Sequence, residues 1–219
     1  MTAIPPPLLV LGTTNAGKLR ELTLLLEPLG IACRSLADEP LAVEVEETGT
    51  SFAENAALKA SLQARALGAW VLAEDSGLVV PALGGAPGIF SARFAGAGNG
   101  DGRADERNNA LLLERLARHR DADRAAHYAC HAALADPSGA IVATAEGVCG
   151  GVIAEAPQGA GGFGYDPLFI VPEYHRTFGD LAPDVKSVIS HRGRAMRAII
   201  PAIVKHLSVH KIATAQAGA

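Results

Sequence analysis

The sequence predicts an α/β fold, because short apolar strand patterns alternate with amphipathic helix patterns along the 219 residues. Hydrophobic residues make up 49% of the chain and charged residues 19%, so a substantial core can form. Neither an internal repeat nor a linker is evident. The length therefore fits one large domain or two lobes that share a core. We expect about the first seven and about the last ten residues to be frayed.

The first predicted strand and helix flank a glycine-containing loop. Leu8–Leu11 is an apolar run after a proline-rich lead, which indicates a buried strand. Leucines recur at helical spacing from Leu19 up to Gly30, with Asn15 as a plausible N-cap. Residues 31–36 are predicted to form a second strand, and residues 37–50 an acidic, irregular segment.

The second predicted helix leads directly into the most apolar strand. Ser51-Phe-Ala-Glu54 is a capping-box pattern, and the helix that it opens is expected to reach about Leu67. Gly68 ends this helix. The run Trp70–Val80 follows at once, and its Trp and Val content favours a buried strand over a helix.

The second half of the chain continues the alternation. An amphipathic helix is predicted over 103–118, with Leu112 and Leu116 on one stripe. Pro201 is expected to bend or weaken a final helix that begins near Arg192. The remaining predictions are a turn cluster at 84–88, a charged turn at 121–124, strands at 127–135 and 140–153 joined by a turn at 136–139, a glycine-rich loop at 159–164 and a strand at 166–171.

Charge, hydropathy and cysteine content exclude several classes of protein. The net charge is −4 and the sequence pI near 6.0, which disfavours broad nucleic-acid binding. No apolar run approaches the roughly 18 residues of a membrane span, and the N-terminus lacks signal-peptide features. Three widely separated cysteines fit neither a disulfide framework nor a cysteine zinc site. We therefore expect a cytoplasmic protein with neither a membrane nor a nucleic-acid partner.

Two adjacent acids, Glu74 and Asp75, interrupt the apolar strand and mark the candidate active site. Burial of an unpaired charge is costly, so such acids need a metal ion, a cationic partner or the mouth of a cleft. Magnesium prefers a few carboxylates together with phosphate oxygens, and Glu46 and Glu47 could add to the set. Asp75 could also accept a proton from an attacking water. The alternatives are a strand end that reaches water and, for Glu46 and Glu47, a solvated acidic loop.

The loop Gly12-x-x-x-x-Gly17-Lys18 matches most of a phosphate-binding P-loop between a strand and a helix. Backbone N–H groups and the helix dipole attract phosphate there, and Lys18 adds a full charge. Leu19 stands where a P-loop NTPase needs Ser or Thr for magnesium. Lys59 could likewise reach a phosphate. An ordinary turn and two solvated lysines remain the alternatives.

Two later segments have the chemistry to recognise a flat base. Phe163-Gly164-Tyr165-Asp166 combines two aromatic rings with flexible backbone, which could stack on a base and bond to its edge. Lys186, His191 and Arg192 place potential donors near a helix start. The alternatives are a tight turn with core aromatics and a basic helix entrance without a ligand. His127 and His131 share a strand face but have no third zinc ligand.

Six motif blocks occur in a fixed order and together resemble the inosine/xanthosine triphosphate pyrophosphatases, enzymes that remove non-standard purine nucleotides. The resemblance extends from about Leu8 to Leu207. Each block alone is weak, whereas six in order are very specific. The blocks are Thr13-Thr14-Asn15-Ala16-Gly17-Lys18, Glu46-Glu47-Thr48-Gly49-x-x-Phe52-x-Glu54-Asn55, Glu74-Asp75-Ser76-Gly77-Leu78, Leu83-Gly-Gly-Ala-Pro-Gly88-x-x-Ser91-Ala-Arg93, Gly161-Gly-Phe-Gly-Tyr-Asp-Pro167 and Lys186-Ser-x-Ile-Ser-His-Arg192.

The resemblance implies a fold, a reaction and a set of roles. The fold would be one domain over residues 1–219, with an elongated mixed β-sheet and flanking helices that form two lobes around a central nucleotide cleft, usually in a homodimer. The reaction would convert ITP, dITP or XTP to the monophosphate and pyrophosphate with Mg²⁺. The implied catalytic residue is Asp75, the implied metal ligands are Asp75, Glu46, Glu47 and Glu74, and the implied substrate-binding residues are Thr13, Thr14, Asn15, Ala16, Gly17, Lys18, Lys59, Ser76, Phe163, Gly164, Tyr165, Asp166, Lys186, His191 and Arg192.

Two positions depart from the commonest family pattern. Thr14 stands where many members have glycine, and Glu74 where many bacterial members have aspartate. The second departure leaves the metal geometry open, as does the choice between Glu46 and Glu47. A P-loop kinase or ATPase and a non-catalytic nucleotide sensor remain rival hypotheses.

Overall fold

A computed structural model describes residues 8–96, 103–118 and 123–217, with side chains described up to Leu207. The chain divides into two compact units. The first unit comprises Met1–Asp75, His131–Glu146 and Arg194–Ala219, and the second comprises Ser76–Cys130 and Gly147–Gly193.

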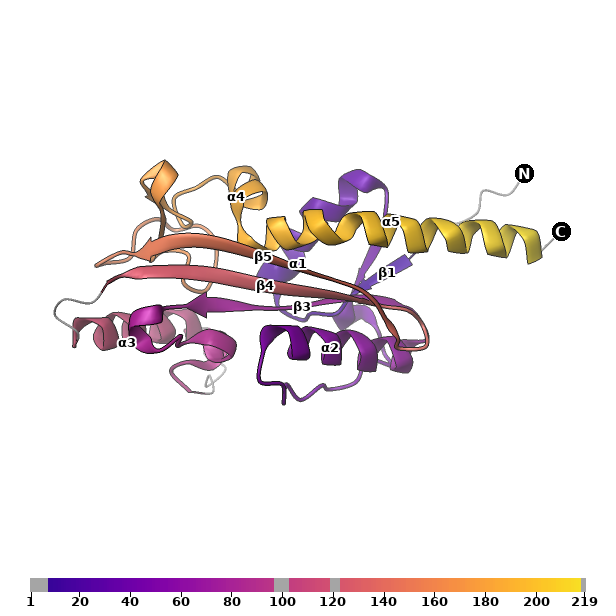
Figure 1. Ribbon diagram of the computed structural model, residues 1–219, viewed down its shortest axis with the longest axis horizontal. Helices are drawn as coiled ribbons and strands as arrows, with labels where there is room; N and C mark the ends of the chain where they lie inside the picture. Colours follow the sequence, from indigo (N-terminus) through magenta and orange to yellow (C-terminus); the bar gives the residue numbers. More distant parts are fainter. Residues whose placement is uncertain (1–7, 97–102, 119–122, 218–219) are drawn as a thin grey trace. The chain divides into compact units, whose positions relative to one another are not determined.

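A seven-stranded mixed sheet is the framework of the fold, in the order β2-β1-β3-β4-β5-β6-β7. β1 pairs in parallel with β2 and β3, whereas β6 pairs antiparallel with β5 and β7. β3, β4 and β5 are the long strands and run side by side (Figure 1). The predicted α/β class with a mixed sheet and flanking helices is confirmed. The strands are β1 Leu8–Leu11, β2 Ala32–Ser35, β3 Trp70–Val79, β4 Ala125–Ala135, β5 Ile141–Ile153, β6 Phe169–Val171 and β7 Arg176–Thr177.

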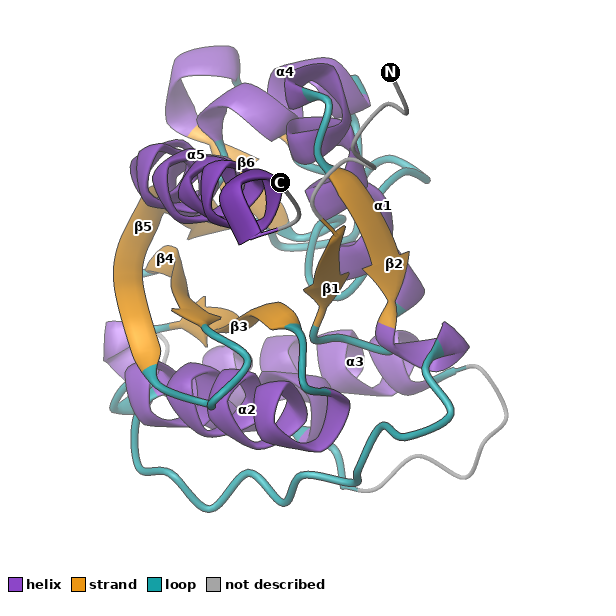
Figure 2. Cartoon of the chain, turned by 90° about the vertical axis from the view of Figure 1, so that its right-hand side faces the viewer, coloured by secondary structure: helices purple, strands orange, loops and turns teal. Residues whose placement is uncertain are grey.

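Helix α2, Phe52–Leu67, covers one face of the sheet in the first unit (Figure 2). Its buried alanines pack against Val10, Val71 and Ala73. Successive side chains of a strand point to opposite faces, so the odd-numbered residues of β3 up to Asp75 face α2. The even-numbered residues Leu72 and Glu74 face the other way. This alternation decides which partner each acid of β3 meets.

The core of the second unit includes Leu78, Tyr128 and Cys149, one residue from each of the three long strands. Helix α3, Ala104–Ala117, packs its Leu112 and Leu116 against Leu78, Tyr128 and the aromatic residues of the later segments. The rings of Tyr128, Phe169 and Phe178 lie 4.7 to 6.0 Å apart, within the usual range for aromatic pairs. The predicted leucine stripe of α3 is therefore a core stripe.

Two predicted helix caps are present, one of them in altered form. Asn15 precedes α1, Ala16–Leu26, and its side chain accepts from the Lys18 backbone N–H. Ser51 caps α2 by accepting from the Glu54 N–H. The Glu54 carboxylate, however, bonds mainly to the backbone N–H and hydroxyl of Thr50, one residue before the cap. Glu54 thus fastens the preceding loop to α2.

The second half of the chain differs from the prediction in one shorter strand and one additional helix. The strand expected at 166–171 is shorter, because residues before Phe169 form turns closed by backbone bonds such as Leu168 N–H to Tyr165 O. A short helix, α4 (Pro183–Ile189), was not predicted, although Pro183 at its first turn is a usual start signal. The final helix, α5 (His191–Ala217), runs through Pro201 without interruption.

The ends of the chain and one turn bear on the remaining predictions. The first seven residues and part of the charged turn at 121–124 lie outside the described residues. The α5 backbone is helical to Ala217. None of the helices in the described ranges combines the length and apolar character needed to cross a membrane.

Candidate active site

Glu74 and Asp75 are buried and meet different lysines, as their opposite faces on β3 require. Glu74 is 1% exposed and Asp75 6% exposed. The Glu74 carboxylate lies 3.1 Å from Nζ of Lys18 on α1. The Asp75 carboxylate lies 2.9 Å from Nζ of Lys59 on α2. Each buried charge therefore has a cationic partner, which offsets the cost of its burial.

Lys59 brings the acidic loop and the strand together. Its ammonium nitrogen lies 2.7 Å from Oε1 of Glu47 and 2.9 Å from Oδ1 of Asp75. Asn55, fully buried on the same face of α2, donates to Asp75 at 3.4 Å and accepts from the Gly49 N–H at 2.8 Å. A Cβ at Gly49 would lie 2.6 Å from the Asn55 oxygen, so the loop approaches α2 too closely for a side chain there. Asn55 is thus a site residue to which the sequence analysis assigned no role, although it stands in the second motif block, four residues before Lys59.

The charges around Asp75 have opposing effects on its pKa. Burial raises the pKa of the Asp75 carboxyl, and the nearby ammonium groups of Lys59 and Lys18 only partly counteract this. Burial alone would lower the pKa of Lys59, but the negative charges of Asp75 and Glu47 outweigh it and raise that pKa. The site thus holds a firmly protonated lysine beside a carboxylate with increased affinity for a proton. This combination suits a general base.

Lys59→Gln is expected to raise the pKa of Asp75 further in protein freed of divalent cations, because it removes the closest positive charge. The folded-state pKa of Asp75 already exceeds its ordinary value of 3.8, so protonation favours the folded protein. This stabilisation is complete below the unfolded-state pKa and disappears as the pH rises through the folded-state pKa. Carboxyl ¹³C NMR titration of wild-type and variant protein measures the shift.

Lys205→Gln is the matched control for this titration, since Lys205 is an exposed lysine of the first unit. It should leave the Asp75 curve unchanged. An unchanged or lowered Asp75 pKa in Lys59→Gln would contradict the electrostatic role of Lys59.

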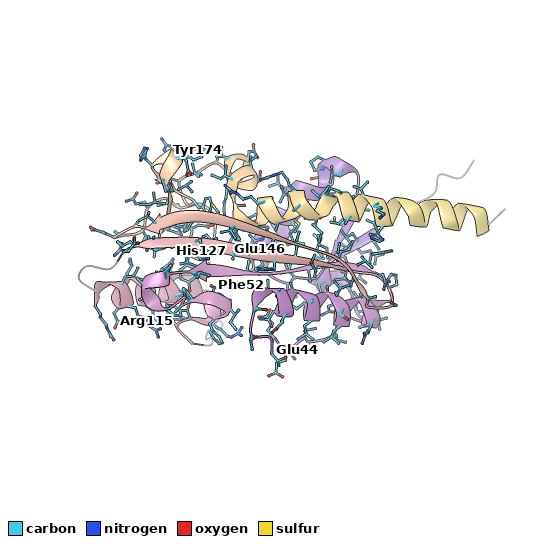
Figure 3. All side chains as sticks on the ribbon, viewed as in Figure 1. Glu44, Phe52, Arg115, His127, Glu146 and Tyr174 are labelled. Atoms are coloured by element: carbon cyan, nitrogen blue, oxygen red, sulfur yellow. The ribbon has the colours of Figure 1, made fainter. Side chains whose placement is uncertain are left out.

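The carboxylates have the chemistry to hold a hard divalent cation. The carboxylates of Glu47 and Asp75 both contact Nζ of Lys59, so these two carboxylates lie close enough together to bind one cation. Magnesium is usually bound through one or two carboxylates plus waters and substrate phosphates, so this pair fits. No cluster of three or more potential ligands occurs within residues 8–96, 103–118 and 123–207. Glu46 is exposed, and Glu44 of the same loop extends away from α2 (Figure 3).

The predicted phosphate loop leaves β1 and becomes the first turn of α1. Thr14, Asn15 and Ala16 are exposed, while Gly17 is buried and Lys18 half-buried. The Asn15 N–H donates to the Thr13 hydroxyl at 3.2 Å, which fixes the turn. The loop therefore presents an exposed helix N-terminus with Lys18 beside it, an arrangement that favours an anion.

The predicted base-recognition residues come together in the second unit. The Phe163 ring lies under two cations, 4.9 Å from Nζ of Lys186 and 5.6 Å from Cζ of Arg192. His191 stacks on Tyr128, with ring centroids 4.5 Å apart and planes inclined by 8°. Arg192 also donates to the Ser76 hydroxyl at 2.9 Å. Tyr128 was not among the predicted site residues, because an aromatic residue within a strand pattern gives no indication in the sequence that it lies near a ligand.

Asp166 organises the loop before it. Its buried carboxylate accepts from the Phe163 N–H at 2.8 Å and pairs with Lys186. A Cβ on Gly162 would collide with the same carboxylate, so the glycine permits this close approach. Asp166 therefore sets the backbone of the aromatic loop and the position of a lysine at once. The Tyr165 ring is buried, and burial raises the pKa of its hydroxyl.

A family model for the Ham1 family matches residues 9–202, nearly the whole described chain. The chain belongs to the Ham1 family. Two relatives, both named dITP/XTP pyrophosphatase, are close in sequence. The one from an Exiguobacterium species is 51% identical over 196 residues, covering 90% of this chain and 96% of the relative. The one from Rhodopirellula baltica is 50% identical over 197 residues, covering 90% and 93%.

Solved structures of Ham1 proteins have the same fold. The HAM1 protein from Coxiella burnetii aligns with a TM-score of 0.80 and 38% identity, covering 91% of this chain and 99% of that chain. A structure from Mycobacterium abscessus, described as a nucleoside-triphosphatase / dITP/XTP pyrophosphatase, aligns with a TM-score of 0.68 and 41% identity over 90% and 99%. The resemblance drawn from the motifs is thereby confirmed.

Proposed function

We propose that this Ham1 protein hydrolyses the non-canonical purine nucleotides ITP, dITP and XTP to the monophosphate and pyrophosphate. The names of relatives about half identical to it support this activity. The structural observation that carries the proposal is the buried Asp75 carboxylate, 2.9 Å from Lys59 and opposite Glu47. This arrangement combines a base, a phosphate-binding cation and a carboxylate pair suited to a divalent ion.

In the proposed reaction, Asp75 accepts a proton from the water that attacks the α-phosphorus. Its raised pKa favours this transfer. Lys18, Lys59 and the N-terminus of α1 stabilise the negative charge on the departing pyrophosphate. Glu47 and Asp75 would hold Mg²⁺, which when bound neutralises phosphate charge and polarises a phosphoryl oxygen.

The second unit would supply recognition of the base. Phe163 offers a ring for stacking, and Lys186, His191 and Arg192 are donors suited to the 6-keto oxygen of hypoxanthine and xanthine. Adenine carries an amino group at that position, so donor would face donor and buried groups would lose their partners. Such a mismatch discriminates more strongly than a difference in size.

A homodimer in the cytoplasm with Mg²⁺ as cofactor completes the proposal. The dimer and the metal follow from the family resemblance of the motif residues. Sedimentation of the purified protein tests the dimer, since a monomer has a mass of 22.5 kDa.

A nucleotide panel tests the proposed function directly. ITP, dITP, XTP, ATP and GTP are each incubated with the protein in Mg²⁺ or in excess EDTA, and pyrophosphate and orthophosphate are measured separately. Pyrophosphate release from the first three, dependent on Mg²⁺, is the expected result. Orthophosphate or a phosphorylated acceptor would indicate an ATPase or kinase. Nucleotide binding without either product would indicate a sensor.

A further inference from the structure

We propose that Asp105 and Asn109 of helix α3 are positioning residues that set base selectivity by fixing the peptide groups of Gly164. This inference rests on the proposed function, because it concerns recognition of the base by the Phe163–Asp166 loop. Neither residue lies in the motif blocks that resemble the pyrophosphatases. Both reach the loop from a helix far away in the sequence.

The two side chains hold one residue by both of its backbone polar groups. Oδ2 of Asp105 accepts from the Gly164 N–H at 2.6 Å. Nδ2 of Asn109 donates to the Gly164 carbonyl at 3.0 Å. Residues four apart lie on the same face of a helix, so one turn of α3 presents an acceptor and a donor at the right spacing. A hydrogen bond to an ionised carboxylate is also stronger than a neutral one.

The held residue determines the direction of the aromatic loop. Gly164 has a φ of +62°, in the left-handed region that favours glycine. Because glycine is conformationally permissive, contacts from other residues must fix the conformation of this turn. Phe163 precedes it, and the Phe163 N–H is fixed by Asp166 at 2.8 Å. The backbone that carries the Phe163 ring is therefore held on both sides: Asp166 holds the Phe163 N–H, and Asp105 and Asn109 hold the peptide groups of Gly164.

Tyr165, on the other side of Gly164, is anchored as well. Its hydroxyl donates to the Ser91 carbonyl at 2.9 Å, and Asn108 of α3 donates to that same carbonyl at 3.3 Å. Helix α3 thus contacts both Gly164 and the Ser91 carbonyl to which Tyr165 is anchored. A shift of α3 relative to Gly164 would move the Phe163 ring away from Lys186 and Arg192.

The burial of the Asn109 amide supports this role. It is 9% exposed, and its Oδ1 atom is buried with no hydrogen-bond partner among the described residues. A buried polar atom without a partner lowers stability, so an apolar residue would serve a purely structural purpose better. The bond from Nδ2 to Gly164 accounts for an amide at this position.

Four α3 variants test the proposal. Asp105→Ala and Asn109→Leu each remove one bond to Gly164. Asp105→Asn keeps an acceptor of the same shape. Glu106→Ala removes the neighbouring exposed acid of the same helix turn and is the matched control. Pyrophosphate release from dITP and from dATP gives KM, kcat and their ratio, and the Gly164 amide resonance in ¹⁵N NMR reports the bond to Asp105.

For Asp105→Ala and Asn109→Leu we expect KM for dITP to rise about tenfold, with kcat changed little. The preference for dITP over dATP should fall by about the same factor. Asp105→Asn should restore most of the preference, Glu106→Ala should leave it unchanged, and Asn109→Leu should not lower Tm. The Gly164 amide should move upfield in Asp105→Ala.

The possible failures are distinguishable. A wild-type protein that releases no pyrophosphate from dITP would overturn the proposed function, and the selectivity claim with it. Normal wild-type turnover with an unchanged preference in both loss-of-bond variants would overturn the positioning role alone. So would a preference that falls only in parallel with a lower Tm.

Discussion

Asp75→Asn is expected to reduce pyrophosphate release from dITP by roughly 10²–10⁴-fold, the usual contribution of a positioned general base. The amide has the shape of the carboxyl but cannot take a proton from the attacking water. Stability should be kept or increased, because burial already disfavours the ionised carboxylate, as the raised pKa of Asp75 shows. Lys59 would retain Glu47, 2.7 Å away, as a counterion.

The measurement is initial-rate pyrophosphate release at saturating dITP, together with urea unfolding of the same preparations. Glu44→Gln is the matched control, since Glu44 is an exposed acid of the loop that also carries Glu47. It should leave both the rate and the unfolding midpoint unchanged. A rate for Asp75→Asn within a few-fold of wild type would remove Asp75 from the base role.

Lys186→Met is expected to destabilise the protein by about 3–5 kcal/mol, because it leaves the buried Asp166 carboxylate without its ion-pair partner. Lys186 and Asp166 are 5% and 2% exposed, so water cannot take the place of the ammonium group. The Asp166 carboxylate would keep its bond from the Phe163 N–H, which offsets only part of the loss. Urea unfolding measures the change.

The double variant Lys186→Met/Asp166→Asn separates this electrostatic cost from lost packing. Asn can still accept from the Phe163 N–H but carries no charge, so the double variant should be more stable than Lys186→Met alone. Asp166→Asn alone completes the cycle. A double variant no more stable than Lys186→Met would show that the Lys186 stem, packed near Phe163 and Phe178, carries the effect instead.

Local signals predicted most of the fold. The β1 bounds match the predicted run, and the caps at Asn15 and Ser51 lie where the short polar side chains indicated. The strand expected at 166–171 was too long because Asp166 uses its side chain to close a turn with the Phe163 N–H. A side-chain carboxylate that accepts a backbone hydrogen bond in this way leaves no periodic pattern in the sequence. Asp166 was therefore assigned to the apolar strand that follows it.

The candidate site was predictable in its composition but not in its pairing. Glu74, Asp75, Lys18 and Lys59 were all recognised as charged residues in the right surroundings. Which lysine meets which acid depends on strand alternation and on the opposite placement of α1 and α2, a tertiary property. Asp105 and Asn109 went without a role because their contacts lie with the backbone of a loop distant in sequence, which leaves no mark at the two residues themselves.

The alternating side-chain directions of β3 limit which mutations the residues before Glu74 can tolerate. Substitutions before Glu74 change the packing gradually. Deletion of a single residue between Trp70 and Ala73 would instead turn Glu74 from α1 toward α2, and Asp75 from α2 toward α1. Glu74 would then approach the Lys59 side and Asp75 the Lys18 side. We therefore expect the length of this stretch to be under stricter selection than the identity of its apolar residues, so that a length change should be absent from functional variants recovered in a random insertion–deletion library.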